Sequence, residues 1–460
     1  MSYDGTNAAV LSTMEQLLKR FYLPAMQDQL NNDSVLKMML ETNEKDVAGK
    51  EATIEHHYGR SSGTFAIPDG AALGDANYQK YKTSVVPMKY NYGRVAFSGP
   101  TIKASRSEKG SYGRVIPTEI KGIVKDVGRE TNRQLWGCGY GILARWISGD
   151  TTSHVLQKKY TGNATAPDAF GSTFGAKYFE DNGSAYPSYI ASVSTTVTVT
   201  AIGAVDINVS AITEGTTTDT ITCTNGSVTE AAGTFWTRPN NSPGAMTSAS
   251  AAGLGRREMM GLRGIVTNED LDQIAWTNAG TGIGFVVNDP LQGLATGSYS
   301  WWVANVDSSA TRYGTQRALT FDLIQKMFDK IEIKAGKGVG PNVMLTSHAL
   351  KRRYLDLCQA DRREVNTMKL DRGFEALDFN GIPFTADRDA IDGEIYFLTT
   401  SDLAIYRMSD YEWMDMDGNV LSRISGYDAY EAVLYRYAEL GCVRRNSQGV
   451  LCDLAYDPTF

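Results

Sequence analysis

A serine and two histidines near residue 60 are the first groups whose spacing could support chemistry. Residues 59–63 read G-R-S-S-G, which matches the Gly-x-Ser-x-Gly turn that presents a nucleophilic serine in hydrolases. That turn needs a strand before it and a helix directly after it. Residues 64–68 read T-F-A-I-P and do not begin a helix. We therefore interpret residues 59–63 as a flexible loop.

Metal-ligand chemistry is equally poorly supported. His56 and His57 are two of only four histidines, and adjacent residues on a strand point to opposite faces. We expect two half-exposed strand residues there. Residues 415–419 read D-M-D-G-N, but glycine is fourth rather than sixth as in a calcium loop, which favours a hairpin turn. We expect no catalytic, cofactor or metal site.

The composition narrows the class of protein. The 460 residues include 45 basic and 52 acidic side chains, a formal charge of −7. A dedicated nucleic-acid binder is usually basic, and Arg444-Arg445 alone is weak evidence of a surface for a polyanion. No apolar run reaches membrane-spanning length, and the first residues do not resemble a signal peptide. The five cysteines contain no Cys-x-x-Cys pair, which predicts scattered reduced thiols.

The N-terminal third predicts two short helical pieces and a long excursion, and each helical piece is either a helix that packs on the core of its own chain or part of an arm that packs on a neighbouring subunit. Ser12 and Glu15 form a capping box before an apolar helical stripe, and residues 35–40 form a second short amphipathic piece. Residues 51–60 and 81–98 read as extended arms around a tip rich in glycine and alanine. Arms of about twenty residues reach on the order of 60 Å, and an isolated two-stranded hairpin is barely stable in water. We expect this excursion, residues 51–98, to lie on another subunit.

The remaining chain predicts a long helix, a threonine-rich β segment and an α/β region. The helix begins near Pro117 and ends before Gly137, and its residues at helical spacing are Ile120, Ile123, Val124, Val127, Thr131, Leu135 and Trp136. Period-two alternation between residues 187 and 255 predicts an inserted set of short strands. Thr320 is expected to cap a second helix. The strands at 429–443 and 450–454 are expected to pair through a turn at residues 446–449.

This order of parts resembles the major capsid protein of tailed bacteriophages, the Hong Kong 97-like fold. The segments that carry the resemblance are R-E-T-N-R-Q-L-W-G-C-G-Y-G at 129–141, P-N-V-M-L-T-S-H-A-L-K-R-R-Y at 341–354, and N-G-I-P-F-T-A-D-R-D-A-I-D-G-E-I-Y-F-L at 380–398. The resemblance covers nearly the whole chain through the order and spacing of its parts. It implies an α+β fold.

The family resemblance also implies a division of the chain. Its expected parts are an N-terminal arm (1–50), an E-loop (51–98), a P-domain with its spine helix (99–139), two parts of an A-domain (140–186 and 256–375) separated by a β-rich insertion (187–255), and strands that return to both domains (376–460). The expected inter-subunit contacts are Phe21 and Tyr22 in the arm and Phe65, Ile67, Tyr78 and Tyr81 in the E-loop.

The function that the resemblance implies is structural, not enzymatic. The chain is expected to self-assemble into hexamers and pentamers of an icosahedral head around double-stranded DNA, which it contacts non-specifically. Its expected partners are further copies of itself, a scaffolding protein and the portal, with a decoration protein as a further candidate and no membrane. Its expected place is the virion, assembled in the bacterial cytoplasm. The alternative is a tail-associated or secreted carbohydrate-binding protein built around the threonine-rich segment.

Overall fold

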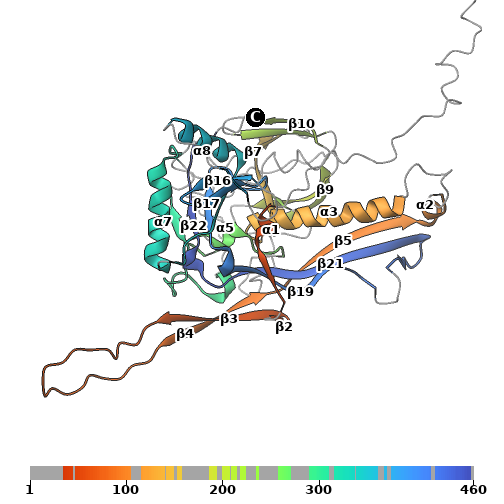
Figure 1. Cartoon of the computed structure of the whole chain (residues 1–460). Helices are drawn as coiled ribbons and strands as arrows, with labels where there is room; N and C mark the ends of the chain where they lie inside the picture. The colour runs from red at the N-terminus through yellow and green to blue at the C-terminus, as the bar shows by residue number, and fades with distance from the viewer. Residues whose placement is uncertain are drawn as a thin grey trace, which may run out of the picture.

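The computed structural model is a mixed α+β chain (Figure 1). It describes residues 35–44, 47–104, 115–139, 141–149, 153–157, 186–193, 199–207, 209–214, 218–223, 235–237, 257–270, 290–309, 315–336, 338–360, 367–369, 375–415 and 420–456. Its described helices are α1 (Val35–Met39), α2 (Gly99–Ala104), α3 (Val115–Trp136), α5 (Leu262–Ile265), α7 (Phe321–Ala335) and α8 (His348–Ala360). The predicted helices at 35–40 and 117–136 are therefore confirmed as α1 and α3.

The long helix α3 lies along a five-stranded sheet (Figure 1). The strands of that sheet are β1 (Glu41–Asn43), β5 (Lys89–Ser98), β19 (Leu403–Trp413), β20 (Ser422–Arg423) and β21 (Ala429–Cys442). Helix and sheet are tied by a 2.6 Å hydrogen bond between the hydroxyls of Thr131 and Tyr411. Leu135 and Trp136 are fully buried, whereas Val124 is exposed, so the predicted stripe is buried most deeply at its C-terminal end.

A seven-stranded sheet separates two hydrophobic cores. In spatial order its strands are β13 (Asn305–Asp307), β22 (Gly449–Leu451), β18 (Ile395–Leu398), β14 (Val343–Thr346), β17 (Ile382–Ala386), β16 (Glu375–Phe379) and β15 (Thr367–Lys369). Side chains alternate between the two faces of a strand. Met344 and Phe397 accordingly pack with α7 and α8, whereas Leu345 and Tyr396 join the core that contains Trp136.

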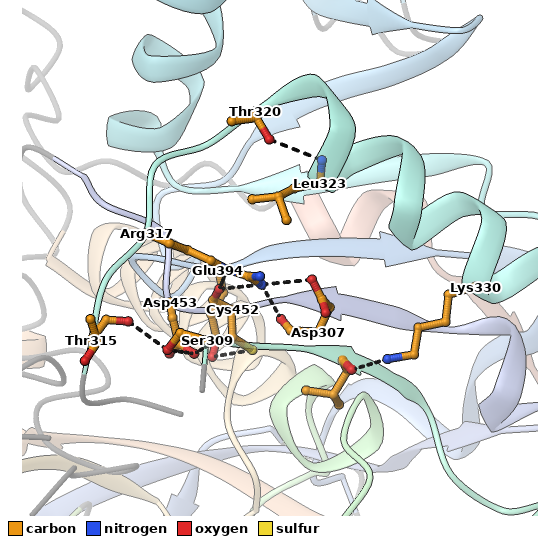
Figure 2. Close-up of polar contacts among 11 residues, drawn as sticks. Asp307, Ser309, Thr315, Arg317, Thr320, Leu323, Lys330, Glu394, Cys452 and Asp453 are labelled. Atoms are coloured by element: carbon orange, nitrogen blue, oxygen red, sulfur yellow. Dashed lines mark hydrogen bonds and ion pairs between the residues drawn. The ribbon is translucent and has the colours of Figure 1, made fainter. Parts of the chain in front are cut away.

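The start of α7 is fixed by polar contacts on both sides of it (Figure 2). As predicted, the Thr320 hydroxyl caps the helix and accepts a 3.3 Å hydrogen bond from Leu323 N. Before the cap, Arg317 Nη2 donates to Asp307 Oδ2 at 3.0 Å and to the Cys452 carbonyl at 3.3 Å. Asp307 ends β13 and Cys452 follows β22, so this guanidinium joins two parallel strands.

The threonine-rich segment forms a sheet that extends beyond its predicted boundary. The strands of this sheet are β6 (Ile142–Gly149), β7 (Ser153–Gln157), β8 (Tyr186–Val193), β9 (Val199–Ile207), β10 (Val209–Glu214), β11 (Thr218–Cys223) and β12 (Phe235–Thr237). β11 pairs with β7, and β12 pairs with β6. β6 and β7 therefore belong to the same sheet as the threonine-rich strands, because they form hydrogen bonds with β12 and β11.

The predicted pairing of the last two strands is wrong. β21 pairs with β19 and β5, whereas β22 pairs with β13 and β18 in the other sheet. A short 3-10 helix at Arg445–Ser447 carries the chain between them. Arg445 fixes this crossing because its buried guanidinium donates to the carbonyls of Ile265, Trp302, Gly264 and Glu269 at 2.8 to 3.5 Å. Arg445 thus holds the interior together and does not face a polyanion.

The expected excursion is shorter than predicted. β3 (Glu51–Gly59) and β4 (Lys80–Pro87) form an antiparallel hairpin, and β2 (Val47–Ala48) adds a short strand to β3. The second half of the predicted arm is β5, which pairs along its full length with β21 instead. The physical reason is that a paired strand over the long helix buries more apolar surface than a free arm.

Candidate functional site

The β3–β4 hairpin projects from the body of the molecule (Figure 1). Its register runs from Glu51 opposite Pro87 to Gly59 opposite Lys80, and residues 60–79 form the tip beyond it. Within the tip, Ser61 Oγ donates to the Asn77 carbonyl at 2.9 Å and accepts from Gly63 N at 3.1 Å. Ser61 therefore closes a loop that no helix follows. The expected loop is confirmed for residues 60–63, whereas Gly59 is the last residue of β3.

The hairpin exposes large apolar side chains at its tip and on the adjoining end of β4. The exposed fractions are 45% for Phe65, 41% for Ile67, 75% for Tyr78 and 66% for Tyr81. Leu73, which the sequence did not single out, is 79% exposed. Water-exposed rings and branched chains on a two-stranded ribbon gain no burial within the monomer. The four predicted E-loop contacts are thus available to a partner, and their role stays a prediction. Phe21 and Tyr22 lie outside the described residues.

The root of the hairpin is held by a small apolar cluster. Ala52, Val86 and Met88 pack with Tyr406 of β19, and all four are buried. This cluster joins the hairpin to the five-stranded sheet, since β19 is one of its central strands. The hairpin is consequently anchored at its base and free at its tip.

A second contact, the aromatic clamp, lies further along the hairpin. We define it as His56 and Tyr58 of β3, which pack against Trp301 and Trp302 of the body, together with Tyr299, whose ring lies 6.1 Å from that of Trp301. Tyr58 stacks on Trp301 with ring centroids 5.2 Å apart, and the His56 ring lies 4.8 Å from that of Trp302. The clamp therefore fixes the direction in which the hairpin leaves the body.

His56 and His57 have opposite environments, as their adjacency on a strand requires. His57 is exposed, and its Nε2 lies 2.8 Å from Gln79 Oε1. His56 is only 7% exposed, so the expectation of a half-exposed side chain is wrong for it. Its Nε2 lies 2.7 Å from Ser84 Oγ. Burial lowers the pKa of His56, and a backbone hydrogen bond with Val443 opposes that shift.

A second exposed aromatic surface lies on the five-stranded sheet, on the side away from α3. We name Tyr90 and Tyr92 of β5 and Tyr435 and Tyr437 of β21 the tyrosine face. Tyr90 pairs with Tyr437 and Tyr92 with Tyr435, and Tyr90 and Tyr92 are 51% and 57% exposed. A hydrogen bond with Tyr92, together with partial burial, raises the pKa of Tyr437 to about 12. The Tyr437 phenol is therefore uncharged at neutral pH.

Sequence reasoning missed the clamp and the tyrosine face. The alternation Tyr90, Tyr92 and Tyr435, Tyr437 was a readable sign of two aromatic strand faces, but the sequence did not show that the strands are neighbours. The pair Trp301-Trp302 carries no periodic signal. Its contact with β3 joins residues about 245 positions apart, a separation that local patterns do not encode.

The described residues include histidine, cysteine and carboxylate side chains, the types that bind metal ions or act as nucleophiles. Among them, no group of three or more histidine, cysteine or carboxylate side chains is placed to hold a metal ion. Cys138, Cys358, Cys442 and Cys452 are buried and form no disulfide, and burial raises the pKa of Cys442 to about 12, which makes its thiol poorly reactive at neutral pH. Within the same part of the chain, no helix has the length and apolar character that crossing a bilayer requires.

Comparison with known proteins identifies the fold. No family model matches the chain, and no curated protein matches it in sequence. The structure is similar to a chain of the cyanophage A-1(L) capsid asymmetric unit, with a TM-score of 0.56, 13% identity, and coverage of 97% of this chain and 99% of that one. It is also similar to a capsid chain of an empty GTA particle, with a TM-score of 0.51, 10% identity and coverage of 98% and 99%. The predicted resemblance to phage capsid proteins is confirmed as an α+β capsid-protein fold over nearly the full chain.

Proposed function

We propose that the chain is a structural subunit that self-assembles into the shell of a phage head. The observation that carries the proposal is the projecting hairpin with an apolar, exposed tip on a capsid-protein fold. A two-stranded ribbon of this kind gains stability only when another surface covers it. In this proposal the hairpin is the E-loop, and the surface that covers it belongs to a neighbouring copy.

The arrangement of surfaces supports head-to-tail assembly. The hairpin leaves one side of the molecule, and β5, β21 and α3 extend on the other (Figure 1). The tyrosine face is an exposed aromatic surface of the kind that interfaces favour. A head-to-tail contact between different surfaces closes into rings when its rotation permits. Rings of six and five copies are the proposed capsomers.

The other parts of the chain have proposed roles in the same scheme. Residues 1–50 are the N-terminal arm, α3 is the spine of the P-domain, and the seven-stranded central sheet belongs to the A-domain. Residues 187–255 are the insertion, and a decoration protein is a candidate partner for it. A scaffolding protein and the portal are proposed assembly partners. The acidic chain encloses double-stranded DNA without tight binding, since its net charge of −7 disfavours contact with phosphates.

Deletion of residues 62–78 tests the proposal. Ser61 lies beside Asn77, so the deletion leaves a short turn between Gly59 and Lys80 and preserves the paired strands. We expect this variant to fold, with unchanged far-UV circular dichroism, and to fail to form shells in negative-stain electron microscopy. The matched control is Ile333→Ser, which removes an 83% exposed apolar side chain from α7. Normal shells from the deletion variant would overturn the proposed role of the hairpin.

A further inference from the structure

The aromatic clamp contains one histidine ring, His56, at the point where the hairpin leaves the body. His56 lies where the hairpin passes Trp301 and Trp302, with ring centroids 5.6 and 4.8 Å from theirs. Beyond the clamp, every residue from 64 to 79 of the hairpin tip is exposed. Any change in how His56 packs is therefore transmitted to the direction of the whole tip.

We propose that His56 is an acid-sensitive latch that keeps the hairpin docked while its imidazole is neutral and releases the hairpin when the ring is protonated. A charged imidazolium in this position exchanges water for a serine hydroxyl and two indole rings tilted to it by 50° and 58°, whose attraction for a cation replaces the lost hydration only in part. The released hairpin remains tethered by the cluster of Ala52, Val86, Met88 and Tyr406. Acid would thus loosen the tip without unfolding the body.

The charged groups around His56 do not remove this penalty. On β4, the cross-strand partner of His56 is Lys82, whose ammonium lies 5.3 Å from the Tyr299 ring centroid. On β3, Glu55 and His57 are the sequence neighbours and project to the opposite face. Directly after β21, a backbone hydrogen bond with Val443 favours the protonated His56 ring. The next residue, Arg444, carries a positive charge, and its Nε lies 4.0 Å from Asp402 Oδ2. Burial outweighs the Val443 contact, since the net shift is downward.

The sign of the pH dependence follows from that shift. A free histidine has a pKa of about 6.5, and docked His56 has a lower one. Docking is therefore at full strength above pH 6.5 and weakens as pH falls from about 6.5 through the pKa of docked His56. In that window the equilibrium constant for docking falls by up to about tenfold for each unit by which the pH is lowered, because one proton is taken up when the hairpin is released.

Hydrogen exchange on the full-length, unassembled chain tests the latch. The measured quantity is the protection factor of amides in β3 and β4 between pH 8 and pH 5, corrected for intrinsic exchange, with α7 amides as an internal reference. We expect hairpin protection to fall at least about threefold while α7 protection is unchanged. His57→Gln is the matched control, because His57 is exposed on the same strand, and it should keep the response. His56→Gln and His56→Leu should abolish the pH dependence.

Two results would overturn the latch. One is a flat hairpin profile in the wild type, and the other is an undiminished pH response in a folded His56 variant. If both variants lose α7 protection, the wild-type and His57→Gln profiles alone decide the outcome. The role of the latch in assembly rests on the proposed function, but exchange in the unassembled chain does not. A responsive hairpin on a chain that never forms shells would contradict the shell proposal and leave the latch standing.

Discussion

Asp387 is a buried carboxylate at the point where α1 meets the rest of the molecule. Its Oδ2 accepts a 3.0 Å hydrogen bond from Leu36 N, so a residue 351 positions away caps the first turn of α1. Asn132 of α3 donates to Asp387 Oδ1 at 3.3 Å and to Asp389 Oδ2 at 2.8 Å. Burial and the charge of Asp389 raise the pKa of Asp387 to about 6 against these hydrogen bonds.

This raised pKa predicts how stability depends on pH. The folded pKa of Asp387 exceeds its unfolded value of 3.8, so its contribution is present below pH 3.8 and is lost as pH rises through about 6. Asp389→Asn removes one repulsion and keeps an oxygen for Asn132. We expect it to raise the free energy of unfolding by about 0.5–1 kcal/mol at pH 7.5, with no gain near pH 4.

Urea titrations at the two pH values measure the Asp389→Asn effect. Asp356→Asn on α8 is the control, since it changes an exposed carboxylate, and it should shift stability little at either pH. A loss of stability in Asp389→Asn that is larger at pH 7.5 than near pH 4 would instead mean that Asp389 must be charged to hold Asn132.

At the scale of elements, the contact between α3 and β5 depends on a close approach at Gly93. A Cβ there would lie 2.8 Å from Val127 Cγ2 and 3.1 Å from Ile123 Cγ1. Gly93→Ala is therefore expected to push helix and strand apart and to cost about 1–3 kcal/mol in denaturant unfolding. Gly122 in the same helix has nothing within 4 Å of such a Cβ. Gly122→Ala is the matched control and should stabilise the chain by up to about 1 kcal/mol. Equal effects of the two substitutions would contradict a close approach of helix and strand at Gly93.

Elements were predictable from the sequence where their signal is local. The helix α3 and the cap at Thr320 depend on a few consecutive residues, and both are confirmed, whereas Val124 of the predicted stripe is exposed. Strand partners were not predictable, because pairing depends on residues far apart. The alternation of side-chain types along β5 is the same whether the strand projects as an arm or pairs within the body. Only its register with β21 shows that it belongs to the body. Arg445 likewise read as a surface charge, since its four carbonyl partners come from distant segments.

At the scale of the whole molecule, we expect folding and assembly to depend on different apolar residues. The two main cores bury the side chains that stabilise the monomer on either side of the central sheet. The hairpin tip and the tyrosine face keep theirs in water. A monomer rarely exposes large apolar patches unless they bind a partner. Variants in these two regions should therefore separate assembly from folding.

The tyrosine face provides the test of that separation. Tyr90→Ser with Tyr92→Ser removes two half-exposed rings while the backbone pairing of β5 with β21 remains. We expect the double variant to lose about 1 kcal/mol or less of folding stability, because exposed rings contribute little burial. We expect it to form no shells. Truncation of an aromatic anchor at an interface costs about 2 kcal/mol or more of binding free energy, and every copy in a shell would lose that binding energy. Sedimentation velocity and electron microscopy would measure assembly, and urea unfolding would measure stability. Normal shells from a stable double variant would exclude the tyrosine face from the inter-subunit contact and leave the hairpin to bind elsewhere on its neighbour.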